Sequence, residues 1–376
     1  MLDFIEPHYL YVPVAAFMLV VLLVMPFRKL ARLLGIVDAP GGRKQHDKAI
    51  PPIGGLIIFT VFLSLSVIVG AVDLREYWPL YTSLILLLMS GALDDMFSLN
   101  AWVKFCVHIF AAALIAFVGG VQAAYLGDLF GFGVVWTGFM SYPFTIIAIV
   151  LLINAMNLID GMDGLAGGLS VVMFCWMIVA CVCAGWYQDV YVLSILVGSV
   201  VGFLVFNMRN PWRRKASLFL GDAGSMSLGL SIAWFAVHLA RGPQTPIEPI
   251  AVAWIIGFPI FDTCAQFYRR IRAGRDPFSP DRGHFHHHFI DAGVPVRKAS
   301  VIIIALVALM GGIGIGGVAM GVPNVVLTVG WVALLFVHIA MSYKPERYVC
   351  LIRKLCFISD EDKSASVQCA DKGSCL

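Results

Sequence analysis

Charged side chains are scarce in this chain. Only 13% of its 376 residues are charged and 60% are hydrophobic, whereas soluble domains carry about twice that charged fraction. A soluble fold could not bury so much apolar surface, so the composition excludes an ordinary soluble protein. The nine cysteines stand singly, which excludes a disulfide framework. We also find no short internal repeat and no HExxH helix, the motif of a zinc-dependent protease.

A basic segment is missing before the first apolar stretch. The chain begins with the acidic residues Asp3 and Glu6, whereas a secretory signal peptide begins with a positively charged region. We therefore expect the first apolar stretch to remain in the protein as an uncleaved membrane span.

Apolar stretches of about 20 residues recur along the whole chain. That length allows a helix to cross a hydrocarbon core roughly 30 Å thick. The sequence therefore predicts an all-α polytopic membrane protein with about 11 transmembrane helices. We place them near 8–27, 52–71, 77–93, 102–120, 137–155, 167–184, 188–206, 218–239, 249–268, 299–319 and 324–342.

Lys and Arg residues fall almost entirely on one side of this predicted arrangement. Of 26 such residues only two, Arg75 and Arg241, lie on the other side. The positive-inside rule then places the N-terminus outside and the C-terminus in the cytoplasm of a bacterial inner membrane. We expect one membrane domain over 1–343 and a polar, partly disordered cytoplasmic tail over 344–376. The predicted cytoplasmic active-site loops are 28–51, 94–101, 154–166, 207–222 and 269–298.

The basic residues also suggest which partners the chain has. With a formal net charge of +3 and basic residues gathered on one face, we expect attraction to anionic membrane lipid and phosphorylated substrates rather than nucleic acid. Assembly as a homodimer is compatible with this interpretation.

Four polar residues follow the fifth predicted span in NAMNLIDGMDGLAGG. Asn154, Asn157, Asp160 and Asp163 are spaced by three, so they can line one helical face. The amides suit a nucleobase or a sugar amide, and the carboxylates suit ribose hydroxyls or a metal. A capped helix end is the structural alternative. Because polar groups beside apolar spans are costly unless they are used, we favour a functional site.

Two acidic residues, Asp94 and Asp95, end the third predicted span. Adjacent carboxylates at a low-dielectric boundary repel each other unless a cation or a proton compensates them. A divalent ion or a proton-transfer role would resolve this, and a solvated turn is the alternative. Asp222 in SLFLGDAGSMSLG could likewise hold Mg²⁺ against phosphates or simply cap a helix.

Arginine and histidine are concentrated in the loop RRIRAGRDPFSPDRGHFHHHFIDAG. Guanidinium and imidazole groups make charge-assisted hydrogen bonds to phosphate oxygens, so a diphosphate is the simplest ligand. A zinc site is the alternative, although the arginines oppose a second cation. The residues concerned are Arg269, Arg270, Arg272, Arg275, Arg282, His284, His286, His287 and His288.

These motifs in this order resemble the polyprenyl-phosphate N-acetylhexosamine-1-phosphate transferase family. The matching segments are DD at 94–95, NxxNxxDGxDGL at 154–165, FLGDAGS at 219–225 and SPDRxHxHH at 279–287. The RKQH segment ending at His46, with the PPIGG after it, is most similar to the undecaprenyl-phosphate GlcNAc-1-phosphate transferase branch.

The resemblance implies transfer of an N-acetylhexosamine 1-phosphate from a UDP-N-acetylhexosamine, such as UDP-GlcNAc, to undecaprenyl phosphate. This would be the first membrane step of a cell-surface polysaccharide, would release UMP and would need Mg²⁺ or Mn²⁺. Related sequences often carry a third acid where this chain has Ser98, so we place the metal chiefly on Asp222. A further family acid matches Asp262.

The resemblance and the residue chemistry together assign three sets of site residues. The catalytic set is Asp94, Asp95, Asp222 and His286. The substrate-binding set is Asn154, Asn157, Asp160, Asp163, Lys104, Arg282, His284, His287, Lys44 and His46. The metal set is Asp222, Asp160 and Asp163.

A different class of protein, an ion- or proton-coupled transporter, also places carboxylates and histidines near membranes. A transporter is expected to concentrate them near the midpoints of its spans. Here the motifs lie at the inner ends of the predicted spans, which favours the transferase.

Overall fold

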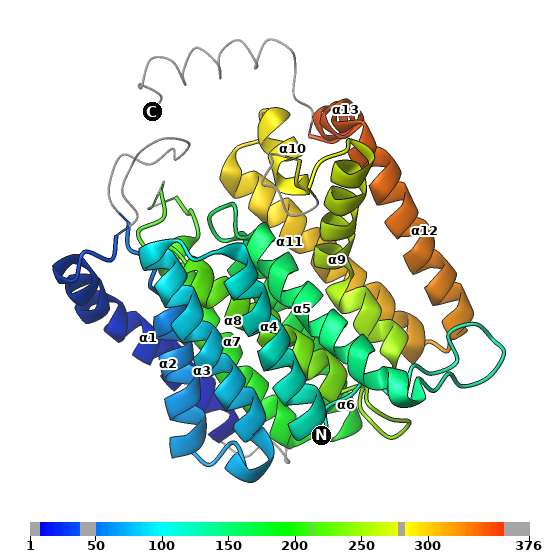
Figure 1. The fold of residues 1–376 in the computed structure, drawn as a ribbon, viewed down its shortest axis with the longest axis horizontal. Coiled ribbons are helices and arrows are strands. Elements are labelled where there is room, and N and C mark those ends of the chain that lie inside the picture. Colours follow the sequence, from blue (N-terminus) through cyan, green and yellow to red (C-terminus); the bar gives the residue numbers. More distant parts are fainter. Residues whose placement is uncertain (1–7, 38–49, 212, 214, 277–282, 357–376) are drawn as a thin grey trace.

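The computed structural model describes residues 8–37, 50–211, 213, 215–276 and 283–356. In these residues the chain folds as a bundle of long helices (Figure 1). The helices are α1 (His8–Leu33), α2 (Gly54–Ile68), α3 (Leu74–Phe97), α4 (Ala101–Ala113), α5 (Ser141–Ile159), α6 (Leu165–Ala184), α7 (Tyr187–Asn207), α8 (Gly221–His238), α9 (Pro249–Arg272), α10 (Phe285–Asp291), α11 (Val296–Ala319), α12 (Asn324–Tyr343) and α13 (Pro345–Leu355). A π-helical turn, η1 (Leu114–Val118), extends α4, and a 3₁₀ turn, η2 (Gly138–Met140), precedes α5.

The predicted polytopic all-α membrane protein is confirmed. In the described part of the chain, nine helices are long and apolar enough to cross a membrane. Two of the eleven predicted spans are not among these nine helices. The segment near 52–71 forms α2, which is apolar but has only 15 residues. The segment near 218–239 forms α8, which begins with GDAGSMS and is therefore rich in small and polar residues.

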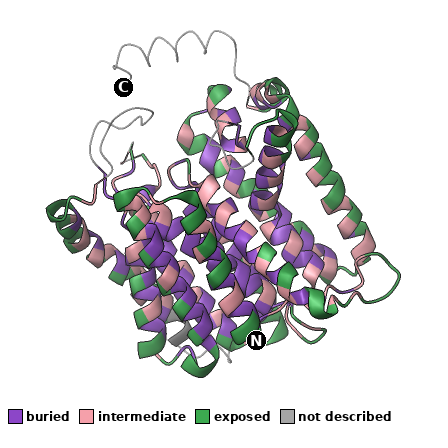
Figure 2. Cartoon of the chain, viewed as in Figure 1, coloured by how far each residue is buried: buried purple, intermediate pink, exposed green. Residues whose placement is uncertain are grey.

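Helix α8 forms the centre of the bundle. Most of its side chains are buried, and it packs against α2, α3 and α5. Figure 2 shows the buried residues inside the bundle and many exposed ones on α12 at its edge. The exposed side chains of α12 include Val329 and Phe336, as expected where a helix faces lipid.

Glycines allow α8 to approach its neighbours backbone to backbone. A Cβ on Gly91 of α3 would lie 2.3 Å from the Cα of Ala223, and a Cβ on Gly55 of α2 would lie 2.1 Å from the Cα of Gly224. Small residues at helix contacts are the usual basis of close packing in membranes. They bring the acidic end of α3 against the first turn of α8.

Helices α3 and α8 start at opposite ends of the bundle. The last turn of α3 meets the first turn of α8, so Arg75 at the start of α3 and Arg241 after α8 both lie at the opposite end. The two basic residues that the sequence assigned to the outer side are thus separated from the acidic motifs by the length of a helix.

The predicted polar tail begins with a helix. Helix α13 packs against α10 and α12 and buries Tyr348 and Ile352. Residues 357–376, the rest of that tail, lie outside the described residues.

Candidate functional site

A cavity of about 1040 Å³ opens where α3 and α5 end and α8 begins. It collects polar residues that are far apart in the sequence. Its charged and histidine lining consists of Asp94, Asp95, Asp160, Asp163, Asp222, Arg209, Lys215, His286 and His287. The cavity lies at one end of the bundle, not at the span midpoints where a transporter would concentrate such groups.

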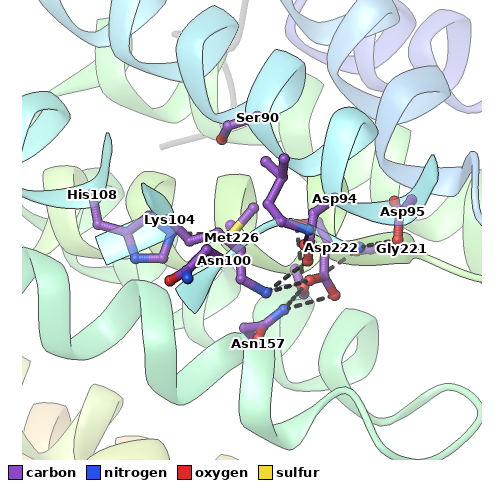
Figure 3. A network of polar contacts seen from close by, with 12 residues as sticks. Ser90, Asp94, Asp95, Asn100, Lys104, His108, Asn157, Gly221, Asp222 and Met226 are labelled. Atoms are coloured by element: carbon purple, nitrogen blue, oxygen red, sulfur yellow. Dashed lines mark hydrogen bonds and ion pairs between the residues drawn. The ribbon is translucent and has the colours of Figure 1, made fainter. Parts of the chain in front are cut away.

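Lys104 on α4 joins the acids of two helices (Figure 3). Its Nζ lies 2.6 Å from Asp94 Oδ2 and 3.4 Å from Asp222 Oδ2. Asn157 Nδ2 donates to Asp222 Oδ1 at 3.1 Å and to Ser225 Oγ at 2.9 Å. Asp222 lies in the first turn of α8 and accepts from two other helices, so its side chain is part of the site and not a helix cap.

The adjacent carboxylates of α3 point to different partners. Asp94 is compensated by Lys104 and accepts the backbone N–H of Leu99 at 2.7 Å. Asp95 Oδ1 accepts the backbone N–H of Asp222 at 3.1 Å. Asp95 Oδ2 is buried and has no hydrogen-bond partner. Since an unsatisfied buried oxygen is costly, this atom is a candidate for contact with a bound ligand or cation.

Asp160 and Asp163 lie in a loop. The prediction that four polar residues share one helical face is wrong, because α5 ends at Ile159 and the chain turns before Asp160. The loop is fixed by Gly164, whose N–H donates to Asn207 Oδ1 at 2.7 Å, and by Ser300, whose Oγ donates to the carbonyl of Asp163 at 3.0 Å.

Asn154 lies outside the cavity lining. Its amide donates to the carbonyl of Val150 at 2.7 Å and lies 3.4 Å from His108 Nδ1. One helical turn thus separates it from the site, whereas Asn157 reaches Asp222. Asn154, predicted to bind substrate, therefore does not line the cavity.

Two cations that the site assignment missed face the cavity. Arg209 Nε donates to Asp163 Oδ2 at 2.6 Å, and Lys215 lines the same cavity. Both belong to the loop 207–222, where the sequence shows only a general excess of basic residues. Asn207 was not predicted either. It holds two loops together, because its Oδ1 accepts the N–H of Gly164 and its Nδ2 donates to the carbonyl of Leu218 at 2.9 Å.

Negative charge exceeds positive charge on one side of the cavity. Burial first, and then the neighbouring Asp222, Asp95 and Asp163, together raise the pKa of Asp160 to about 8. Within the described residues no three His, Cys, Asp or Glu side chains form a ready metal cluster. Mg²⁺, however, commonly takes one or two carboxylates and completes its shell with water and substrate phosphates. The crowded carboxylates and the orphaned Asp95 oxygen fit such an ion.

The histidine tract is divided between two surroundings. His286 and His287 line the cavity, and a Cβ on Gly161 would lie 2.5 Å from His286 Nε2. Only glycine therefore allows the imidazole to approach the acidic loop. His284, predicted to bind substrate, does not line the cavity. Its Nδ1 lies 2.8 Å from Asp262 Oδ2.

His286 is neutral at physiological pH. Burial first, and then the nearby His287, together lower its pKa to about 3. Its Nε2 is buried without a hydrogen-bond partner. A neutral imidazole has one donor and one acceptor nitrogen, so His286 is suited to hydrogen bonding with a ligand.

The arginines of the same loop occupy a separate hollow. Arg269, Arg270 and Arg275 line a space of about 470 Å³ together with His288. The predicted single cluster of arginine and histidine is therefore divided between two spaces. The predicted residues Lys44, His46 and Arg282 lie outside the described residues.

Comparison with known proteins agrees with the motifs. The model of the family "Glycosyl transferase family 4" matches residues 77–240. A protein of Escherichia coli (strain K12) named undecaprenyl-phosphate alpha-N-acetylglucosaminyl 1-phosphate transferase is 32% identical over 356 residues, covering 91% of this chain and 94% of the relative. Proteins of the same name from Yersinia pestis and Haemophilus influenzae are 34% and 33% identical, over 77% and 83% of this chain and 79% and 88% of their own lengths. The chain therefore belongs to glycosyl transferase family 4.

Proposed function

We propose that this protein transfers N-acetylglucosamine 1-phosphate from UDP-GlcNAc to undecaprenyl phosphate, releasing UMP. One observation supports this chemistry above the others. Five carboxylates, two imidazoles and three cationic side chains meet where helices end, in or beside a cavity of about 1040 Å³. The relatives' names supply the lipid acceptor and the sugar phosphate.

Two anions must meet in this reaction. An oxygen of the lipid phosphate attacks the phosphorus that carries the sugar. A new P–O–P bond forms, the bond between that phosphorus and the oxygen of UMP breaks, and UMP leaves with the electron pair. The approach is unfavourable unless positive charge and hydrogen-bond donors balance the phosphates.

The described residues offer these groups in two places. Lys104, between Asp94 and Asp222, offers its ammonium where the lipid phosphate would enter from the membrane. Arg209, His286 and His287 offer donors beside the loop of Asp160 and Asp163 for the donor diphosphate. Direct attack by the lipid phosphate needs no covalent enzyme intermediate, because the nucleophile is already anionic.

A divalent cation completes the proposal. Asp222, with Asp160 or Asp163 as a second carboxylate, would hold Mg²⁺ or Mn²⁺, which would supply positive charge against the donor diphosphate. Asn157 orients Asp222 through its bond to Oδ1, and the backbone bond from Asp222 to Asp95 fixes the start of α8.

The site faces the cytoplasm of the inner membrane in this proposal. The excess of Lys and Arg at the acidic end of the bundle favours that orientation by the positive-inside rule. A UDP-sugar from the cytosol and a lipid phosphate at the membrane surface would then meet at the same cavity.

Purified protein tests the function. It is incubated with Mg²⁺, undecaprenyl phosphate and, in turn, UDP-GlcNAc, UDP-GalNAc or UDP-glucose, with Asp222→Asn as the inactive control. We expect one lipid product with the mass of undecaprenyl-diphospho-GlcNAc and one equivalent of UMP. Release of UDP instead of UMP would show transfer of the sugar alone and contradict the proposal, as would the absence of any lipid product.

A further inference from the structure

A carboxylate outside the cavity controls the start of α10. Asp262 on α9 is 1% exposed. Its Oδ2 pairs with His284 Nδ1 at 2.8 Å, and its Oδ1 accepts the backbone N–H of Phe285 at 2.9 Å. Both oxygens of one buried side chain therefore bind the two residues at which α10 begins.

Helix α10 needs this contact because it is short. It has seven residues, and its N-cap His284 makes no side-chain cap hydrogen bond. The first N–H groups of a helix have no partner within the helix. Asp262 supplies one from a neighbouring helix, and a hydrogen bond to a charged acceptor is strong in a buried environment.

Stacked rings connect the Asp262–His284 contact to the cavity. The His284 and His286 rings are parallel within 12° with centroids 5.8 Å apart. His286 in turn lies over Gly161, beside Asp160. The position of His286 against the acidic loop is thus tied to Asp262 through His284.

Helices α12 and α13 support α10 from behind. The Tyr348 hydroxyl lies 2.8 Å from His338 Nδ1, and His338 Nε2 lies 3.9 Å from Asp262 Oδ1. The Tyr348 ring packs edge-on to Phe285 at 5.1 Å and stacks on His288 at 5.3 Å. A helix from the predicted polar tail is therefore part of the support.

We infer that Asp262, His338 and Tyr348 form a positioning network that holds His286 and His287 of α10 against the cavity loop of Asp160 and Asp163, where the proposed donor diphosphate binds. The inference rests on the proposed function, since it concerns the same site. These residues touch no substrate and act through α10, so their loss should weaken use of the UDP-sugar and leave binding of the lipid acceptor unchanged.

The chain contains a matched control at the opposite end of the bundle. Asp189 is also buried, lies 3.2 Å from His238 Nε2 and accepts from the Tyr77 hydroxyl at 3.3 Å. This cluster has the same three residue types but no contact with α10. Asp189→Asn should therefore lower stability without changing substrate kinetics.

The experiment compares Asp262→Asn with Asp189→Asn in the full chain. We expect Asp262→Asn to raise the KM for UDP-GlcNAc by about tenfold or more, the scale seen when the orienting partner of a metal-ligating histidine is lost, with the KM for undecaprenyl phosphate unchanged. Tyr348→Ala should act in the same direction. Tyr348→Phe keeps the ring contacts but loses the hydroxyl contact with His338, so it should have a smaller effect in that direction. If both Asp variants alter the same constants in proportion to their loss of stability, or Asp262→Asn alters neither KM, the inference is wrong.

A second measurement does not depend on turnover. Hydrogen exchange of peptides covering residues 284–292 should accelerate in Asp262→Asn and Tyr348→Ala, and stay unchanged in Asp189→Asn. If the wild type fails to transfer any sugar phosphate, the proposed function falls but this measurement still tests the network. Unchanged exchange in both α10-directed variants would overturn it.

Discussion

Replacing Lys104 with Met tests how the cavity balances its charge. The substitution keeps the apolar stem and removes the ammonium that lies 2.6 Å from Asp94 and 3.4 Å from Asp222. The Lys104 and Asp94 side chains are 25% and 10% exposed, so the pair is intermediate between a surface pair and a buried one. A hydrogen bond to a charged group contributes about 1.5–3 kcal/mol in such a setting.

The expected loss appears mainly in catalysis. Without Lys104, an arriving lipid phosphate would meet two uncompensated carboxylates. A loss of about 2–3 kcal/mol corresponds to a decrease of about 30- to 150-fold in kcat/KM for undecaprenyl phosphate. Lys104→Arg keeps the charge and should retain more activity than Lys104→Met.

The assay follows UMP release while each substrate is varied in turn. Lys298→Met is the matched control, because Lys298 is exposed in the first turn of α11 and does not line the cavity. A folded Lys104→Met protein that keeps more than half of the wild-type kcat/KM would refute the charge-balance argument.

Four further predictions concern the metal, pH, mechanism and orientation. Asp222→Asn should abolish nearly all UMP release at every Mg²⁺ concentration, because it keeps the shape but removes the charge. The pKa of His286 is about 3 in the folded protein and near 6.5 in the unfolded chain. The contribution of this neutral ring to the free energy of unfolding is therefore complete above pH 6.5 and decreases as the pH falls toward 3, because only the unfolded chain takes up the proton. Thermal unfolding of His286→Asn should therefore depend less on pH between 6 and 4 than the wild type does. Incubation with labelled UDP-GlcNAc and no lipid should leave no label on the protein, since stoichiometric retention would indicate a covalent intermediate. A cysteine at Lys298, in a background without exposed native cysteines, should react with an impermeant reagent only from the cytoplasmic side.

Much of the fold could be predicted from composition and segment length. Apolar stretches of about 20 residues identify membrane spans because the bilayer demands that length. The prediction was less accurate for α2 and α8. Their segments are apolar enough to be noticed, but α2 is short and α8 is specialised for close packing through Gly224 against Gly55.

The candidate site was only partly predictable. Asp94, Asp160 and Asp222 stood out because carboxylates beside apolar spans are costly unless they have a use. Their partners did not stand out. Lys104 is 118 residues from Asp222 in sequence, and Arg209 looks like any basic residue of its loop until it is found 2.6 Å from Asp163.

Local sequence therefore determined which segments span the membrane and which acids and histidines are unusual there, because hydropathy and charge act residue by residue. Tertiary structure alone decided which of them meet. The turn after Ile159 removed Asp160 from the helical face of Asn157, and the backbone contact of α3 with α8 brought Asp95 to the N–H of Asp222. Asp262 and Tyr348 gained their places behind α10 in the same way, since α12 packs against α9, and α13 packs against both α10 and α12.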